Sequence, residues 1–326
     1  MNSSKKNLLV TAPLDFLPDI KKMLNSEFNL HYHNSINYER TQQVLSTISF
    51  DGWLVSPCPE YKIDAKLLDL CPTLSIIATP STGSNHINTQ DAKNRNINIY
   101  SLKGSEEVNK IYASSEYTFH LMMATIRYSP FAFQSVLNGN WREVEDLFRG
   151  REMHGLTLGI IGYGRIGSNL AKYANTFRMN VLAYDPYVEI PQSDGVQQFL
   201  KLEDFLPKCD VLAVCIHLND ETYRIINESF FQQLKDGVYF INTSRGDVVD
   251  EDALIENLQN GKIKAAGIDV ISNEFSSDKS RHPLIQYAKR NNNLIITPHI
   301  AGLTYDSERK AQQAAVDAIR NHLKTS

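Results

Sequence analysis

The sequence has few cysteines, no long basic run and no long apolar run, and each absence excludes a class of protein. The four cysteines are Cys58, Cys71, Cys209 and Cys215. They form no CxxC pair and have no spacing suited to zinc, so we expect four buried free thiols. The sequence therefore predicts a protein without a bound metal.

The charge balance and the hydropathy pattern exclude further partners. The formal net charge is −4 and no long run is basic, so nucleic acid is not expected as a partner. The apolar run near the N-terminus is only Leu8, Leu9 and Val10, whereas a signal peptide needs roughly 7–15 apolar residues. No stretch approaches the ~20 apolar residues that span a bilayer. We therefore expect a cytoplasmic protein that has no membrane partner.

Length and composition are typical of a globular protein with two domains. The 326 residues exceed the roughly 250–300 that a single core normally serves, and 42% of them are hydrophobic. Short apolar runs alternate with helix-period segments before residue 104 and again after residue 156. This alternation predicts α/β architecture with parallel sheets. Between the two series, apolar residues at steps of three and four predict one long helix over residues 105–129.

The clearest single motif is the glycine-rich turn in LGIIGYGRIG. Gly162, Gly164 and Gly167 form G-x-G-x-x-G between an apolar strand and an amphipathic helix. In such a turn the first glycine permits the tight bend, the second lets a pyrophosphate approach the helix N-terminus, and the third lets helix pack on strand. Asp185 ends the next strand and can accept hydrogen bonds from ribose hydroxyls, while its charge would repel a 2′-phosphate. The motif therefore predicts NAD as the cofactor.

Three polar side chains follow three later strands of the same predicted sheet. Arg245 follows VYFIN, Glu274 follows AAGIDV, and His299 follows LIITP. The carboxyl ends of parallel strands meet at one edge, where nucleotides and substrates bind. Arg245 can bind a substrate carboxylate with its planar fork and polarise a neighbouring carbonyl. His299 can give or take a proton near neutral pH, and Glu274 can pair with it and favour its charged form.

The chain resembles the D-isomer-specific 2-hydroxyacid dehydrogenases over nearly its whole length, most densely from about residue 104 to 303. The motifs that carry the resemblance are STGSNHIN (81–88), SSEYTFHLMMATIR (114–127), NGNWR (138–142), GLTLGIIGYGRIG (155–167), AYDP (183–186), INTSRGDVVDEDAL (241–254), AAGIDV (265–270) and TPHIAG (297–302). The resemblance implies that Arg245 binds the substrate carboxylate, that His299 is the catalytic acid/base, and that Glu274 is its partner.

The resemblance also implies which residues surround the cofactor and the substrate. The loop Thr82-Gly83-Ser84 would offer backbone N–H groups to the substrate carboxylate. Asp269 would lie near the nicotinamide, and the segment around residues 217–222 would line the dinucleotide site. The predicted cofactor-binding residues are Tyr163, Gly164, Arg165, Ile166, Asp185, His217, Thr222, Thr243 and Asp269.

The family fold implies two doubly wound parallel-sheet α/β domains. The Rossmann domain that binds NAD would cover residues 104–303. The flavodoxin-like substrate domain would be discontinuous, built from residues 1–103 and 304–326, and the active site would be the cleft. A homodimer, formed largely through the nucleotide domain, is also implied.

These inferences predict an NAD-dependent oxidoreductase that interconverts a 2-oxo acid and a 2-hydroxy acid, and the resemblance implies the (R) product. A formate-dehydrogenase-like enzyme would typically have glutamine at the position of Glu274. A phosphoglycerate-dehydrogenase-type enzyme uses basic residues near SPCPEYKID (56–64), which has no arginine, although Lys62 or Lys103 could substitute. A dinucleotide-sensing regulatory protein can keep the catalytic residues, and only the absence of long appended tails argues against it.

Overall fold

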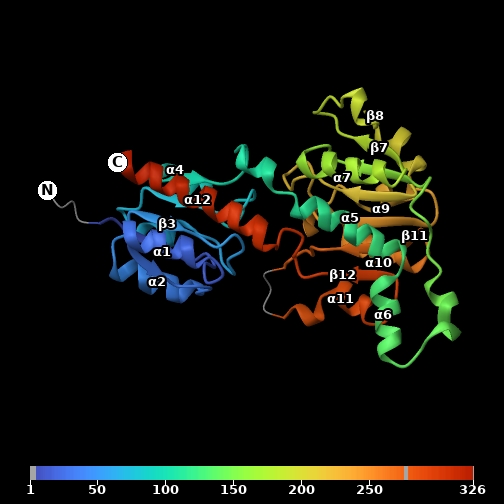
Figure 1. Cartoon of the computed structure of the whole chain (residues 1–326), viewed down its shortest axis with the longest axis horizontal. Helices are drawn as coiled ribbons and strands as arrows, with labels where there is room; N and C mark the ends of the chain where they lie inside the picture. Colours follow the sequence, from blue (N-terminus) through green and yellow to red (C-terminus); the bar gives the residue numbers. More distant parts are fainter. Residues whose placement is uncertain (1–4, 275–277, 326) are drawn as a thin grey trace. The chain divides into compact units, whose positions relative to one another are not determined.

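The described residues of the computed structural model, 5–274 and 278–325, form two units, each built on a parallel sheet (Figure 1). Unit 1 comprises Met1–Ile111 and Leu303–Ser326, and unit 2 comprises Tyr112–Gly302. The boundaries predicted from the sequence lie after residues 103 and 303. Among the described residues, no helix is both long enough and apolar enough to cross a membrane.

Unit 1 has a five-stranded parallel sheet in the order β2-β1-β3-β4-β5. Its strands are β1 (Asn7–Val10), β2 (Asn29–Tyr32), β3 (Gly52–Leu54), β4 (Ile76–Ala78) and β5 (Asn98–Tyr100). Its helices are α1 (Pro18–Glu27), α2 (Tyr38–Thr47), α3 (Ala65–Asp69), α4 (Thr89–Asn94), the 3-10 turn η1 (Glu107–Lys110) and α12 (Tyr305–Thr325). The last helix returns to the first domain because its buried face, with Val316 and Ile319, packs in one core with Leu8 and Leu54 of the sheet. The strand order is that of flavodoxin-like folds.

Unit 2 has a seven-stranded parallel sheet in the order β12-β11-β10-β9-β6-β7-β8. Its strands are β6 (Thr157–Ile161), β7 (Asn180–Tyr184), β8 (Gln197–Phe199), β9 (Val211–Val214), β10 (Val238–Asn242), β11 (Ile263–Ile268) and β12 (Leu294–Ile296). Its α-helices are α5 (Ala113–Ile126), α6 (Ser129–Leu137), α7 (Arg165–Thr176), α8 (Leu202–Phe205), α9 (Glu228–Gln232), α10 (Glu251–Gln259) and α11 (Pro283–Ala288). Its 3-10 turns are η2 (Arg142–Phe148), η3 (Gln192–Asp194), η4 (Leu206–Lys208), η5 (Gly246–Val248) and η6 (Lys279–Arg281). Both sheets are doubly wound, so the predicted fold class is confirmed.

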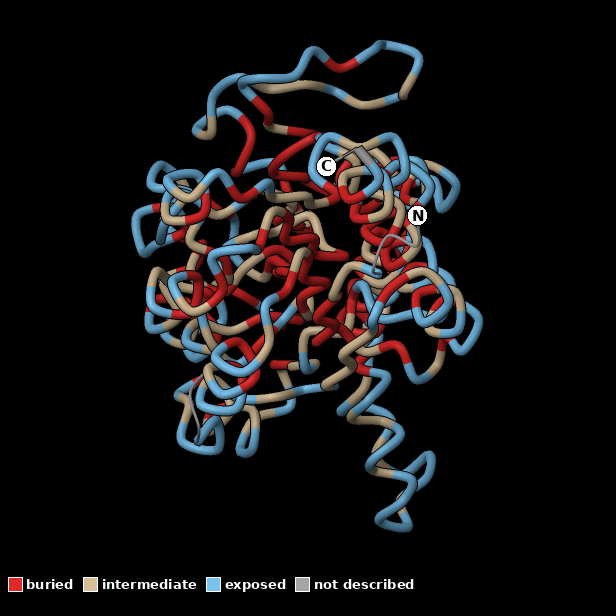
Figure 2. The backbone as a smooth tube through the Cα atoms, turned by 90° about the vertical axis from the view of Figure 1, so that its left-hand side faces the viewer, coloured by how far each residue is buried: buried red, intermediate tan, exposed pale blue. Residues whose placement is uncertain are grey.

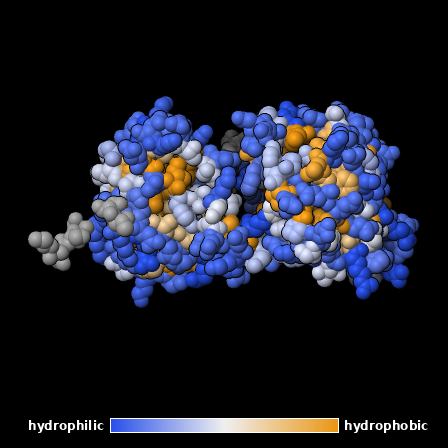
Figure 3. Space-filling view, turned by 90° about the horizontal axis from the view of Figure 1, so that it is seen from above, coloured by the Kyte–Doolittle hydropathy of each residue, from blue (hydrophilic) through white to orange (hydrophobic). Residues whose placement is uncertain are grey.

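The sheet of unit 2 is buried on both faces because successive side chains of each strand enter different cores. In β9, Val211 and Ala213 join the core under α5 and α7, whereas Leu212 and Val214 join the core under α9 and α10. The buried backbone is drawn in red in Figure 2. The surface in Figure 3 is mostly hydrophilic on each unit, with hydrophobic side chains in separate patches. Both faces of this sheet are thus covered, and its strand ends are left to present polar loops.

The long helix predicted over residues 105–129 is wrong. The chain forms η1, then α5, and then turns at Tyr128, whose φ is +53°, into α6. Val108 and Ile111 pack with Ala311 and Ala314 in unit 1, whereas α5 is buried in unit 2. The helical period continues across the break because both segments bury apolar residues, but they bury them in different cores.

The prediction of four buried thiols is correct only in part. All four cysteines are free, and Cys71 and Cys209 are buried. Cys215 is half-buried, and Cys58 is exposed in the loop after β3. Burial raises the pKa of Cys209 and Cys215 to about 12, so neither forms a thiolate near neutral pH.

Candidate active site

The glycine-rich turn joins β6 to α7, and its three glycines have different surroundings. Gly162 has φ +90°, and a Cβ there would lie 2.8 Å from the backbone oxygen of Cys215. A Cβ at Gly167 would lie 2.1 Å from the backbone oxygen of Gly162. A Cβ at Gly164 would meet nothing within 4 Å. The fold therefore requires the first and third glycines, while the second faces open space at the helix N-terminus, which fits an approaching pyrophosphate.

Asp185 stands at the carboxyl end of β7 and is buried. Its Oδ2 accepts the N–H of Tyr163 at 2.8 Å, and its Oδ1 accepts the N–H of Tyr187 at 2.9 Å. Each oxygen keeps a lone pair for another donor, such as a ribose hydroxyl. Asp185 is thus held by the glycine-rich turn itself, since Tyr163 lies between Gly162 and Gly164.

Tyr163 is anchored at both ends. Its hydroxyl donates to Oδ2 of Asp194 at 2.8 Å, and burial together with this bond raises its pKa. The next loop along the edge, after β9, contains His217 and Thr222. The Thr222 hydroxyl donates to the backbone oxygen of His217 at 2.6 Å, so these two predicted residues lie together. The adjacent ends of β7, β6 and β9 thus carry most of the predicted cofactor residues, while Thr243 and Asp269 follow β10 and β11, the next two strands of the sheet.

Arg245 follows β10 in a turn fixed by Asn242. The Asn242 side chain accepts the N–H of Ser244 at 3.0 Å and donates to the backbone oxygen of Arg245 at 3.0 Å. Thr243, between them, shares a 2.6 Å hydrogen bond with the hydroxyl of Thr118 on α5. Within residues 5–274 and 278–325, the Arg245 guanidinium makes one hydrogen bond, to the Ser244 oxygen at 2.6 Å, and no ion pair. Most of its donors are therefore available for an anion.

Glu274 and His299 come together as predicted. His299 Nδ1 lies 2.9 Å from Glu274 Oε2. The side chain of His299 is 32% exposed and that of Glu274 is 23% exposed. Because the carboxylate accepts from Nδ1, it leaves Nε2 to exchange a proton with another group. Asn273 and His299 both have left-handed backbone, with φ of +50° and +56°. The pair is thus held by two loops in an uncommon conformation.

Asp269 is completely buried and organises the loop that carries His299. Its Oδ1 accepts from the Thr297 hydroxyl at 2.5 Å and from the N–H of Ile300 at 2.9 Å. Its Oδ2 accepts the N–H of Ala301 at 2.7 Å, and its backbone oxygen accepts the N–H of His299 at 2.9 Å. The resemblance implies a place near the nicotinamide for this residue, and its own contacts make it a support for the His299 loop.

Asp247 is a charged neighbour of the pair that the sequence reasoning missed. Burial raises its pKa, the negative charge of Glu274 raises it further, and Arg224 opposes both effects. Asp247 follows Arg245 by two residues, so the arginine turn also carries a carboxylate close to Glu274. Its position within the RGDVVD motif was visible in the sequence, but nothing there indicated which way it faces.

The predicted substrate loop lies in unit 1, after β4. The Ser81 hydroxyl donates to the backbone oxygen of Gly83 at 2.6 Å and bends the loop. In the part of the chain that the structure describes, the N–H groups of Thr82, Gly83 and Ser84 donate no hydrogen bond within the protein. They are therefore available for an oxygen acceptor such as a carboxylate.

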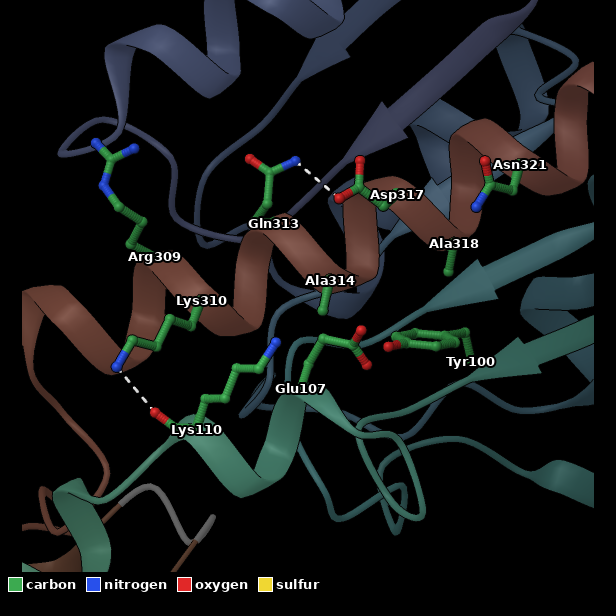
Figure 4. A pocket seen from close by; sticks show the side chains of 10 residues that line it. All are labelled: Tyr100, Glu107, Lys110, Arg309, Lys310, Gln313, Ala314, Asp317, Ala318 and Asn321. Atoms are coloured by element: carbon green, nitrogen blue, oxygen red, sulfur yellow. Dashed lines mark hydrogen bonds between the residues drawn. The ribbon is translucent and has the colours of Figure 1, made fainter.

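Unit 1 also has a groove of about 510 Å³ between η1 and α12 (Figure 4). Most of its charged side chains are satisfied by other groups of the same unit. Arg309 forms two hydrogen bonds with Asp19, Lys310 donates to the backbone oxygen of Lys110, and Gln313 donates to Asp317. The groove contains none of the predicted site residues.

Comparison with known proteins identifies relatives of the chain. The sequence model described as "D-isomer specific 2-hydroxyacid dehydrogenase, NAD binding domain" matches residues 119–301. Hydroxypyruvate reductase of Thermotoga maritima is 32% identical over 262 residues, which cover 80% of this chain and 82% of the relative. D-3-phosphoglycerate dehydrogenase of Archaeoglobus fulgidus is 34% identical over 81% of this chain, but the match spans only 48% of that longer protein. D-lactate dehydrogenase of Aquifex aeolicus, solved with NAD and lactic acid, is 28% identical with a TM-score of 0.84, covering 98% of this chain and 96% of that one.

Proposed function

Because the chain belongs to the D-isomer-specific 2-hydroxyacid dehydrogenase family, we propose a site in which His299 and Arg245 interconvert a 2-oxo acid and a (D)-2-hydroxy acid. The enzyme is an NAD-dependent oxidoreductase that acts on the CH–OH group, as predicted from the sequence. The contact between His299 and Glu274 is the observation that best supports the proposed roles.

Arg245 would bind the substrate carboxylate. Its guanidinium has no ion pair among the described residues, and a carboxylate accepts two parallel hydrogen bonds from such a fork. The free N–H groups of Thr82, Gly83 and Ser84 support the substrate-binding role that the resemblance implies for that loop. Fixing the carboxylate also fixes which face of the neighbouring carbonyl is presented.

His299 would carry the proton. In reduction, protonated His299 donates from Nε2 to the carbonyl oxygen, while bound NADH supplies the hydride for the carbonyl carbon. In oxidation, neutral His299 accepts the hydroxyl proton at the same atom. Glu274 would stabilise the protonated ring through Nδ1 and hold its orientation.

The dinucleotide would occupy the edge formed by the glycine-rich turn and Asp185. The open space at Gly164 fits a pyrophosphate, and the lone pairs left on Asp185 fit the ribose hydroxyls. Arg165, Ile166, His217, Thr222 and Thr243 would complete the cofactor site, with Asp269 beneath the His299 loop. These assignments predict that NADH binds much more tightly than NADPH, whose phosphate would meet the charge of Asp185.

Turnover of small 2-oxo acids tests the proposal. Loss of NADH absorbance should be followed with glyoxylate, hydroxypyruvate, pyruvate and bulkier 2-oxo acids, with 3-phosphohydroxypyruvate as a further arm. We expect turnover of an unphosphorylated acid, since residues 56–64 contain no arginine. Tight NADH binding without turnover of any acid would instead support a dinucleotide-sensing role.

A homodimer formed through unit 2 is proposed as well. Helix α6 has no buried residue, and the chain from α6 to η2 exposes Phe133, Leu137, Trp141 and Leu147 by 62–70%. Figure 2 shows this segment in blue and tan below the red core. Four exposed large apolar side chains on one segment are typical of an interface. Light scattering should give twice the mass of the chain, and Phe133→Glu with Leu137→Glu should give the monomer. The cytoplasmic location stays a prediction.

A further inference from the structure

Glu251 is a nearly buried carboxylate outside the proposed catalytic group. It is the first residue of α10, and its side chain is only 11% exposed. An acidic residue at this position usually faces solvent beside the helix N-terminus. Here Oε1 accepts the N–H of Ser272 at 2.7 Å, and Oε2 accepts the Ser272 hydroxyl at 2.6 Å. Glu251 is therefore bound to the loop after β11, 21 residues further along the chain.

His282 closes the same cluster from the other end of that loop. Its side chain is 8% exposed, and Nε2 lies 3.2 Å from Glu251 Oε2 and 3.1 Å from the Ser272 oxygen. Both neighbours are acceptors, so Nε2 carries the proton. Nδ1 is buried and has no hydrogen-bond partner among the described residues, so the ring is held through Nε2 alone. Glu251 thus ties together Ser272 and His282, on either side of Glu274.

The same cluster connects to the arginine turn. A Cβ at Gly246 would lie 2.0 Å from the backbone carbon of Ile271 and 2.3 Å from the backbone nitrogen of Ser272. The peptide after Arg245 therefore packs directly against the peptide that Glu251 binds. Because the contact is backbone on backbone, a shift of the Ser272 peptide is transmitted to Gly246 and cannot be absorbed by a side chain.

We propose that Glu251, together with Ser272 and His282, is a positioning residue that sets Glu274 against His299 by holding the Ser272 peptide in place against the Arg245 turn. The inference rests on the proposed function of Arg245, Glu274 and His299. Glu251 acts through the backbone of Ser272, two residues before Glu274. The intervening Asn273 has a left-handed backbone, so the direction of Glu274 depends on the Ser272 peptide being held.

Glu251→Gln tests the proposal with a change of similar size. In one orientation of the new glutamine, its amide nitrogen replaces Oε2, which accepts hydrogen bonds from Ser272 Oγ and His282 Nε2. In the other orientation, the amide nitrogen replaces Oε1 and faces the N–H of Ser272. Each orientation breaks at least one bond. We expect kcat for 2-oxo acid reduction to fall by about tenfold or more, but by less than the about 10²–10⁴-fold that loss of the proton donor itself typically costs. The Kd of NADH should stay within about twofold.

A double variant separates positioning from general damage. If Glu251 acts through Glu274, the variant Glu251→Gln/Glu274→Gln should be no slower than Glu274→Gln alone. Multiplicative losses in kcat would overturn the proposal. The control is Asp210→Asn, because Asp210 is another partly buried carboxylate, 17% exposed, that accepts a backbone N–H, that of Thr157 at 2.8 Å. It precedes β9 at the amino ends of the strands and should lower Tm without changing kcat.

A readout without turnover keeps this inference separate from the proposed function. NMR signals of the His299 ring, assigned with His299→Asn, should change in Glu251→Gln in the same direction as in Glu274→Gln. If the protein reduces no 2-oxo acid but these signals change together, the proposed function fails and the positioning stands. Unchanged ring signals in Glu251→Gln overturn the positioning even where turnover is high. If Glu251→Gln does not fold, Ser272→Ala, which loses only the hydroxyl bond, is judged by the same criteria with a smaller loss.

Discussion

The glycine-rich turn offers a test that separates the needs of the fold from those of the cofactor. Gly164 has φ −75° and ψ −163°, a conformation open to alanine, and no atom would lie within 4 Å of a new Cβ. Gly164→Ala should therefore leave Tm unchanged or slightly raised, since alanine reduces the freedom of the unfolded chain by about 0.4–1 kcal/mol.

The cofactor should respond in the opposite way. If the pyrophosphate approaches the backbone at Gly164, the new methyl group occupies its space. Overpacking by one methyl group typically costs about 1–3 kcal/mol. That cost corresponds to a Kd for NADH that is about 5- to 150-fold weaker. Titration of NADH fluorescence measures this Kd, and thermal melts without ligand measure Tm on the same samples.

Gly167→Ala is the matched comparison. Its Cβ would lie 2.1 Å from the backbone oxygen of Gly162, which cannot move without opening the turn. We expect a clear loss of Tm, accompanied by lost NADH binding. The reasoning is refuted if Gly164→Ala binds NADH as tightly as the parent protein, or if Gly167→Ala melts at the parent temperature.

Four further predictions concern single side chains. Asp185→Ser should narrow the preference for NADH over NADPH, and equal Kd values for the two in the parent protein would contradict the role of Asp185. Arg245→Lys keeps the charge but loses the planar guanidinium, so kcat/KM for the 2-oxo acid should fall strongly with little change in the Kd of NADH. A parallel weakening of NADH binding would instead make Arg245 a cofactor-binding residue. As pH rises, the rate of 2-oxo acid reduction should begin to fall at a lower pH in Glu274→Gln than in the parent protein, because the protonated His299 loses its counter-charge. An unshifted pH–rate profile in Glu274→Gln would contradict the pairing. His299→Ala should lower the rate by about 10²–10⁴-fold. Burial lowers the pKa of His86 to about 4, so the folded state binds fewer protons than an unfolded histidine with pKa about 6.5. The free energy of unfolding should therefore fall as pH drops from 7 to 5, by at most about 2 kcal/mol. Calorimetry over this pH range should show a smaller fall for His86→Gln.

The sequence predicted the fold well where its signals are local. Alternation of apolar runs and helix-period segments predicted the parallel α/β sheets, and the carboxyl-end rule brought Glu274 and His299 to one edge, where they touch. NAD and the dehydrogenase family are confirmed as well. The short strand β8, with sequence QQF, was missed because it carries almost no apolar pattern.

Other errors arose where one pattern serves two structures. The same ambiguity produced the single helix over residues 105–129, because helical periodicity does not reveal which core a face enters. Boundaries between domains depend on tertiary contacts, and these are absent from any local window.

The supports of the catalytic pair were beyond sequence reasoning for a different reason. Glu251 follows VVD as an ordinary helix-starting acid, and His282 precedes a proline like many loop histidines. Their meeting with Ser272 requires α10, the loop after β11 and the start of α11 to converge, which only the folded sheet accomplishes. A residue whose partner lies 21 positions away has no signature of its own.

The two loops that carry Glu274 and His299 are stabilised by the same physical device. Each contains a non-glycine residue in left-handed backbone, which costs on the order of 1–3 kcal/mol unless the surroundings hold it. The surroundings in both cases include a carboxylate that accepts backbone N–H groups. The buried Asp269 accepts those of Ile300 and Ala301, and the nearly buried Glu251 accepts that of Ser272. Hydrogen bonds from a backbone donor to a charged acceptor are among the strongest a protein forms. The geometry of the acid/base pair therefore depends on two carboxylates outside the pair, so substitutions at those carboxylates should disturb it more than substitutions of neighbouring loop side chains.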